Sequence, residues 1–274
     1  MKHIARALAA LMLLAMLCPP YINAAGDGVT VYLDGSPTPG SLPTLLSGGR
    51  SYISLKALAD RLGAELSWDS KTRTASMSCR GLTVTAQAGA QYLTANGRAV
   101  YVPGGLPIRG GRMLIPTRAA ALCLNGTAAW DGASRRVYIT SGGGFIPSGD
   151  EYYDPDELYW LSRIISAESR GEPLSGQIAV GNVILNRVSS RDYPNTIWGV
   201  IFDRKYGVQF EPVLNGTVYA DPAAISVTAA KLCLEGVDLS RGSIYFYDPA
   251  IAQSSWIGAN RPYVMTIGNH YFYA

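Results

Sequence analysis

One glutamate in the second half of the chain is the residue best suited to acid–base chemistry. Glu168 follows Leu161 and Ile164 at spacings of seven and four, so on a helix its side chain continues an apolar stripe. Burial of a carboxyl group disfavours its charged form and therefore raises its pKa. We expect Glu168 to remain a protonated acid that can donate to a leaving oxygen.

Glu172 is the rival carboxylate of the same segment. It lies between Gly171 and Pro173, so we expect it to have left the helix. Outside the helix it would cap the next one or pair with Arg170. We therefore prefer Glu168 as the acid.

Thiol and metal mechanisms have less support. Cys233 and His270 are the one thiol–imidazole pair of the C-terminal region, but Cys233 lies between two leucines in an apolar helical stretch. The sequence has no CxxC or HExxH motif and only His270 besides His3, which argues against a zinc amidase. We expect no metal and no cofactor.

The first residues have the pattern of a secretory signal peptide. Two basic residues precede an apolar run over 7–17, and Ala24 and Ala25 supply small residues for cleavage. The alternative, a lipid anchor on Cys18, lacks the usual small residue before the cysteine. We assign 1–25 to a signal peptide and expect an exported protein without a membrane anchor after cleavage.

The remaining chain is nearly neutral, with 21 basic against 20 acidic residues, because Lys2 and Arg6 leave with the signal peptide. It lacks the basic clusters that bind nucleic acid, so no nucleic-acid partner is expected. Three cysteines remain, an odd number. Cys79 and Cys123 either pair with each other or are small buried residues.

Residues 29–141 contain an internal repeat with a spacing of 62 residues. The matching pieces are Tyr52–Lys56 with Leu114–Arg118, Trp68-Asp69 with Trp130-Asp131, and Asp34-Gly35 with Asn96-Gly97. Asp-Gly and Asn-Gly pairs predict tight hairpin turns. Each unit is predicted as a hairpin, a short helix (55–62 or 117–124) and a second hairpin after the Trp-Asp pair.

This pattern resembles the copper amine oxidase N-terminal-like, or stalk, module of exported bacterial proteins. The segment contains no histidine, so we expect no copper site. Trp68 and Trp130 are either core anchors or sugar-stacking residues, and their equivalent places in the repeat favour the core. Residues 142–153 are rich in Gly, Ser and Pro, which is typical of a flexible linker.

Residues 154–274 are predicted to form a separate, mainly helical α+β domain with a small sheet. An Asp154-Pro155 start and Gly171 bound the first helix, and later helices cover 176–188, a short stretch after Asn195, and 221–235. Strands are predicted at 243–247, 263–267 and 270–273. The fold class is α+β throughout, since the two-repeat domain is also α+β.

The C-terminal domain resembles the spore cortex-lytic, SleB-type cell-wall hydrolases. The pieces that match, in family order, are Ile165–Pro173, Gly176–Val180, Val183–Val188, Gln209-Phe210, Asp221–Gly236, Tyr245–Pro249 and Ile267–Tyr273. The resemblance implies a lysozyme-like fold, and cleavage of peptidoglycan after N-acetylmuramic acid, mostly by lytic transglycosylation. It also places the essential glutamate at Glu168. Alternatives are a hydrolytic muramidase and a non-catalytic wall-binding stalk protein.

The same resemblance, with the residue types that bind sugars, gives candidate substrate-binding residues: Asn186, Gln209, Phe210, Tyr247, Trp256 and His270. Phe210 and Trp256 would otherwise be core residues, Asn186 a helix cap, and His270 a turn residue. Glu211-Pro212 departs from the small polar residue common in the family, which leaves this part of the groove open. We expect a monomer that acts on peptidoglycan in the cell wall or spore envelope.

Overall fold

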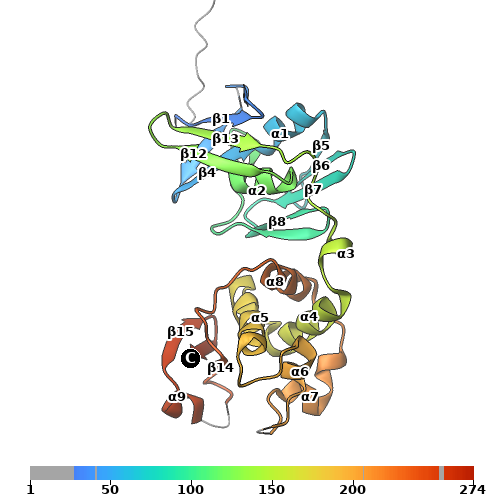
Figure 1. Ribbon diagram of the computed structural model, residues 1–274, viewed down its shortest axis with the longest axis vertical. Coiled ribbons are helices and arrows are strands. Elements are labelled where there is room, and N and C mark those ends of the chain that lie inside the picture. The colour runs from blue at the N-terminus through green and yellow to red at the C-terminus, as the bar shows by residue number, and fades with distance from the viewer. Residues whose placement is uncertain (1–27, 41, 206, 253–255) are drawn as a thin grey trace, which may run out of the picture.

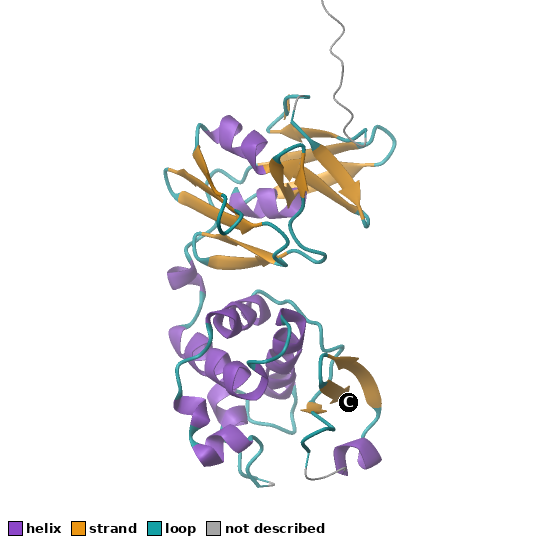
Figure 2. Ribbon diagram, turned by 180° about the vertical axis from the view of Figure 1, so that it is seen from behind, coloured by secondary structure: helices purple, strands orange, loops and turns teal. Residues whose placement is uncertain are grey.

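A computed structural model describes residues 28–274 except 41, 206 and 253–255. The predicted signal peptide, 1–25, and its alternative at Cys18 lie outside the described residues. Within them, no helix is long and apolar enough to cross a membrane. The chain folds into two lobes, an upper one rich in strands and a lower one rich in helices, joined through one short helix (Figures 1 and 2).

The N-terminal lobe packs two short helices among three sheets. The helices are α1 (Leu55–Leu62) and α2 (Thr117–Cys123). The first sheet has the order β12-β13-β1-β2, with strands Thr127–Asp131, Arg136–Thr140, Thr30–Leu33 and Ser36–Pro37. The second has the order β10-β11-β4-β3, with strands Ile108–Arg109, Arg112–Pro116, Arg50–Ser54 and Thr44–Ser47. The third has the order β5-β6-β7-β8-β9, with strands Glu65–Asp69, Thr74–Cys79, Leu82–Gln87, Tyr92–Ala95 and Arg98–Tyr101.

The predicted repeat is visible as a local two-fold relation. Strand β4 of the first unit pairs antiparallel with β11 of the second, and Ile53 lies opposite its repeat equivalent, Ile115. Both predicted hairpin turns form, with positive φ at Asp34-Gly35 and at Asn96-Gly97. The last strand, β13, returns to pair in parallel with β1 and closes the lobe.

One expectation for this lobe is wrong, and one open alternative is decided. Trp68 and Trp130 are 48% and 47% exposed, because β5 and β12 are edge strands with a neighbouring strand on one side only. Of the two alternatives for Cys79 and Cys123, the structure has unpaired thiols. Cys123 is buried at the C-terminal end of α2, and Cys79 is half-buried.

The connection between the lobes differs from a flexible linker. Ile146 is buried in the N-terminal core, its backbone N–H bonds to the Cys123 carbonyl, and its own carbonyl accepts from the Asn96 side chain. Ser148 and Glu151 form a capping box that begins α3 (Gly149–Tyr152). The segment is therefore held to the N-terminal lobe along much of its length.

The C-terminal lobe is a bundle centred on three helices: α4 (Pro155–Ser169), α5 (Leu174–Ser189) and α8 (Ala224–Leu234). Shorter helices α6 (Ile197–Ile201), α7 (Glu211–Asn215) and η1 (Thr217–Tyr219) cover one side. Asp154 caps α4 by accepting from two backbone N–H groups, as its Asp-Pro start predicts. Gly181 of α5 has no room for a side chain, since a Cβ there would lie 2.7 Å from both Cys233 Sγ and Ile165 Cδ1.

A three-stranded sheet packs on the opposite face of α5. Its order is β14-β16-β15, with strands Tyr245–Tyr247, His270–Tyr273 and Tyr263–Ile267, and α9 (Trp256–Asn260) lies between β14 and β15 in sequence. Phe272 fills the contact between this sheet and Ala179, Val180 and Val183 of α5. The helix bundle covers one face of α5 and the sheet covers the other. Both faces of this helix therefore carry apolar residues.

Candidate functional site

Glu168 lies in the last turn of α4, at the edge of the C-terminal core. Leu161, Ile164 and Ile165 of the same helix are fully buried, and Glu168 itself is half-buried at the end of their stripe. The helix ends at Ser169, one residue later, and the chain then turns into the loop before α5. This position gives the carboxyl group an apolar setting on one side and open space on the other.

Two cavities meet at Glu168. The smaller has a volume of about 510 Å³ and runs over the end of α4 toward α7 and η1. The larger has a volume of about 1250 Å³ and runs between α5, α7 and the three-stranded sheet. Glu168, Glu211 and Ile251 line both cavities. A polymer bound across both cavities would therefore pass Glu168 along its length rather than at its end.

The surroundings of Glu168 favour its protonated form. Burial raises its pKa from 4.5 to about 7, and the negative charge of Glu211 acts in the same direction. The positive charge of Arg187 opposes them with a smaller effect. Near neutral pH this carboxyl group can therefore give and take a proton, which is what one acid that serves both steps of a reaction must do.

Arg187 forms a fixed positive wall of the larger cavity. Its Nε donates to the carbonyl of Ile244 at 2.7 Å, and its Nη1 is buried with no hydrogen-bond partner among the described residues. The guanidinium lies 5.1 to 5.5 Å from the ring centres of Tyr193, Phe210 and Tyr245. Burial lowers the pKa of Arg187, but an arginine at this position stays charged at any physiological pH.

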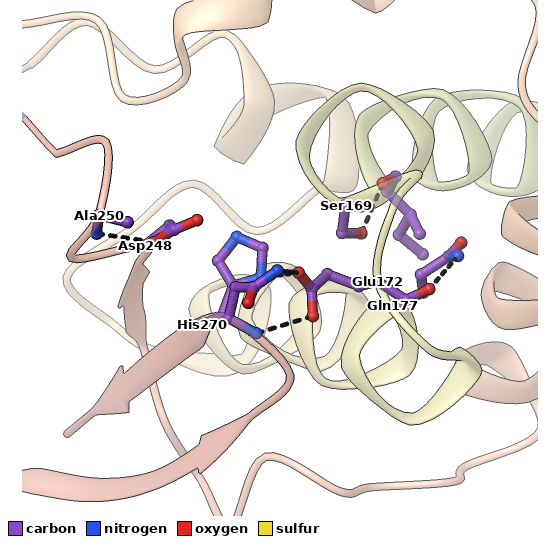
Figure 3. Close-up of polar contacts among 8 residues, drawn as sticks. Ser169, Glu172, Gln177, Asp248, Ala250 and His270 are labelled. Carbon is purple, nitrogen blue, oxygen red and sulfur yellow. Dashed lines mark hydrogen bonds and ion pairs between the residues drawn. The ribbon is translucent and has the colours of Figure 1, made fainter.

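Glu172, the rival acid, has a structural role instead. Its side chain is 6% exposed and reaches from the loop before α5 to the turn that carries Asn269 and His270 (Figure 3). One carboxylate oxygen accepts from the Asn269 backbone N–H at 3.0 Å and the other from the Asn269 side chain at 2.9 Å. It neither caps α5 nor pairs with Arg170, and it lines neither cavity. Glu172 therefore ties the sheet to the helices.

His270 is beside this anchor and also reaches the larger cavity. Its Nδ1 lies 3.8 Å from the Glu172 carboxylate and makes no hydrogen bond within the described residues. Burial lowers its pKa, while the nearby charges of Glu172 and Asp248 act in the opposite direction. His270 is thus mostly neutral at pH 7 and can present a ring nitrogen to a hydroxyl group in the cavity.

Five of the six predicted substrate-binding residues line the larger cavity: Gln209, Phe210, Tyr247, Trp256 and His270. They come from distant parts of the chain. Phe210 is 3% exposed and forms a buried wall, whereas Trp256 is 53% exposed at the rim. The aromatic and amide groups are therefore gathered on one side of Glu168.

Asn186 is not among them. Its side-chain nitrogen donates to Ser240 Oγ and to the Ser243 carbonyl, both at 2.9 Å. These bonds fix the chain that enters β14, so Asn186 positions the sheet without lining either cavity. The helical spacing of the sequence does not distinguish Asn186 from its neighbour Arg187, and it is Arg187 that lines the larger cavity.

Two residues of the site were not assigned to it from the sequence. Arg187 could have been found as a lone arginine within an apolar helix, which calls for a buried partner or a function. Glu211 was considered as a departure from the family pattern and, with Glu172 and Asp203, as a second carboxylate if the enzyme were a hydrolytic muramidase. The thiol alternative has no geometric support, since Cys233 is buried against α5, donates to the Ile178 carbonyl and lies outside both cavities. In the described part of the chain, no cluster of three or more His, Cys, Asp or Glu side chains can hold a metal ion.

Comparison with protein families agrees with this division into two lobes. Residues 32–139 match the model of the copper amine oxidase N-terminal domain, and residues 171–273 match that of the cell wall hydrolases. The second match begins just after Glu168, so the family model does not itself cover that residue.

Curated relatives match over 127 residues, which is 46% of this chain. The spore cortex-lytic enzyme of Bacillus cereus is 37% identical over 46% of its own length, and that of Bacillus subtilis is 35% identical over 39%. The chain thus spans less than half the length of these relatives.

Among solved structures, the catalytic domain of the germination-specific lytic transglycosylase SleB from Bacillus anthracis is 36% identical. All of that domain aligns with 47% of this chain, with a TM-score of 0.41. For the catalytic domain of the Bacillus cereus SleB protein the identity is 37%, with 48% of this chain and all of that domain aligned and a TM-score of 0.40. The C-terminal part of this chain therefore belongs to the cell wall hydrolase family, as a homologue of the spore cortex-lytic enzymes, and follows a copper amine oxidase N-terminal domain.

Proposed function

We propose that this protein cleaves the glycan strands of peptidoglycan by lytic transglycosylation after N-acetylmuramic acid, with Glu168 as its acid and base. The observation that carries the proposal is a half-buried carboxyl group with a pKa near 7 at the junction of two cavities. The names of the relatives, spore cortex-lytic enzymes and a germination-specific lytic transglycosylase, point to the same substrate class.

The reaction needs one carboxyl group that acts twice. Protonated Glu168 gives its proton to the glycosidic oxygen, and the bond between that oxygen and C1 of the muramic acid breaks. The departing sugar leaves as an alcohol, and C1 becomes electron-poor. The C6 hydroxyl of the same muramic acid then attacks C1, while the Glu168 carboxylate accepts the hydroxyl proton. The product is a 1,6-anhydro sugar, no water is consumed, and Glu168 regains its proton.

The larger cavity suits a sugar polymer. Aromatic rings such as Tyr247 and Trp256 offer flat faces to sugar rings, and Gln209 and His270 offer polar groups to hydroxyls. Arg187 supplies the positive charge near which the Glu168 carboxylate forms after proton transfer. We place the protein in the cell envelope, in the wall or the spore cortex, after removal of residues 1–25.

The test is the mass of the released fragments. Purified cortex and vegetative peptidoglycan are digested with the full chain, with Glu168→Gln and with Asp156→Asn, which removes a charge from the exposed start of α4. We expect the wild type and Asp156→Asn to release fragments that end in 1,6-anhydro-N-acetylmuramic acid, and Glu168→Gln to release none.

Two other results would contradict the proposal. Fragments heavier by one water, with reducing ends, would mean that water attacks C1, so the enzyme would be a muramidase. Release by Glu168→Gln at the wild-type rate would remove Glu168 from the mechanism.

A further inference from the structure

Among the described residues, Glu211 is the one carboxylate besides Glu168 that lines both cavities. It begins α7, and its main chain is held on both sides by buried neighbours, Phe210 before it and Pro212 after it. The two buried neighbours hold the main chain of Glu211 in the wall of the site. The position of Glu211 therefore does not depend on contacts of its own carboxylate.

Within residues 28–274 without 41, 206 and 253–255, the Glu211 carboxylate has no structural partner. No described residue forms a hydrogen bond or ion pair with it, in contrast to Glu172, whose two oxygens both bind Asn269. Glu211 is exposed to solvent, so an unpaired carboxylate there is not unusual in itself; what sets it apart is its place in the wall of both cavities, which it shares with Glu168.

The other charged groups near Glu168 do not exert the effect of the Glu211 carboxylate. On α4, Arg163 is paired with Asp221, and just after this helix Arg170 donates to Ser166 and to the Asp221 carbonyl. On α5, Arg187 favours the ionised form of Glu168, and on the sheet His270 is mostly neutral. Asp192 and Asp248 line only the larger cavity, and Glu211 on α7 is the carboxylate whose charge acts on Glu168.

We propose that Glu211 is a second working carboxylate of this site, whose charge keeps the proton on Glu168 until a glycosidic oxygen accepts it. Like charges repel, so the negative charge of Glu211 makes loss of the Glu168 proton to water less favourable. In this proposal Glu211 does not touch the reacting atoms. It is a positioning residue that acts by keeping the proton on Glu168. This role rests on the proposed function of Glu168.

The test compares Glu211→Gln with Asp156→Asn, which removes the same charge from an exposed position of the catalytic lobe outside both cavities. The first readout is the titration of the Glu168 carboxyl carbon by NMR in the full chain. Removing Glu211 should lower the Glu168 midpoint by about one pH unit, the usual scale for one nearby charge. Asp156→Asn should leave it unchanged.

The second readout is the pH profile of kcat/KM on purified peptidoglycan. In Glu211→Gln the fall of activity toward alkaline pH should begin lower, with about five-fold less activity at pH 7 and little change near pH 5, where Glu168 is protonated in both proteins. If Glu211→Gln does not fold, Glu211→Ser removes the same charge with a smaller side chain.

Identical titrations and pH profiles for Glu211→Gln and Asp156→Asn would overturn the proposal. So would a loss of activity at every pH with an unchanged Glu168 titration, since Glu211 would then act on the substrate directly. If instead Glu168→Gln remains active, the proposed function fails. The NMR titration still decides whether the two carboxyl groups are coupled.

Discussion

Burial of Glu168 raises the pKa of its carboxyl group, and this shift has a cost in stability at neutral and alkaline pH. In the unfolded chain its carboxyl group ionises near 4.5, whereas in the folded protein the pKa is about 7. The folded state therefore holds a proton that the unfolded state has lost between these two values. Stability from this group is complete below about pH 4.5 and decreases as the pH rises to about 7.

Glu168→Gln should therefore be more stable than the wild type at alkaline pH. Glutamine never ionises, so at about pH 8 the variant avoids the cost of a charged, half-buried carboxylate, which is up to about 3 kcal/mol for a shift of this size. Near pH 4.5 the two proteins should unfold at similar denaturant concentrations. Urea unfolding at both pH values measures the difference.

The exposed carboxylate of Glu65 on β5 provides the control for this experiment. Glu65→Gln should show no gain that depends on pH. If Glu168→Gln is no more stable than the wild type at about pH 8, the environment of Glu168 does not disfavour its charge, and its role as a neutral acid loses its physical basis.

Helix packing sets where Glu168 lies. Helices α4, α5 and α8 meet at Gly181, where α5 approaches Ile165 on α4 and Cys233 on α8. Gly181 has an ordinary helical φ, so the space, not the backbone angle, requires glycine. Any side chain at this point would push α4 away from α5, and Glu168 is less than one turn from Ile165.

Gly181→Ala should destabilise the protein by about 1 to 3 kcal/mol, the usual cost of one extra carbon in a packed core. It should also lower the activity, because the end of α4 moves. Cys233→Ala removes the sulfur that the new carbon would meet, so the double variant should recover part of the stability. Thermal unfolding and activity of the single and double variants test this.

Cys233→Ala alone also tests the thiol alternative. Because the Cys233 thiol is buried outside both cavities, the single variant should keep its activity on peptidoglycan. Complete loss of activity in a folded Cys233→Ala variant would revive a mechanism that depends on this thiol.

The sequence predicts the positions of helices and turns better than the tertiary contacts between them. Apolar spacing and the Asp-Pro start predicted α4 with Glu168 in its last turn, and the Asp-Gly and Asn-Gly pairs predicted two hairpins, because these are local signals. Exposure of Trp68 and Trp130 was missed, since it depends on which strands lie at a sheet edge. Whether a residue lines a cavity, as Glu211 does and Asn186 does not, depends on contacts between segments far apart in the chain.

At the scale of the whole molecule, the two lobes share a defined interface. Arg98, at the start of β9, forms two hydrogen bonds of 2.8 and 2.6 Å with Glu235 at the end of α8. The Tyr153 hydroxyl donates to the same carboxylate and accepts from the backbone N–H of Ala99. Ala99 itself is part of the C-terminal core. The N-terminal lobe is therefore joined to the C-terminal lobe by more than the intervening chain.

Breaking the Arg98–Glu235 pair should uncouple the lobes while leaving each one folded. The two side chains are only 9% and 11% exposed, so Arg98→Met leaves a buried carboxylate without its partner, at a cost of about 3 kcal/mol. We expect one calorimetric transition in the wild type and two in Arg98→Met. The matched control is Arg112→Met, at an exposed position of β11.

Adding Glu235→Gln to Arg98→Met should restore part of the coupling, because it removes the buried charge that has lost Arg98. Two transitions already present in the wild type would show that this interface does not couple the lobes.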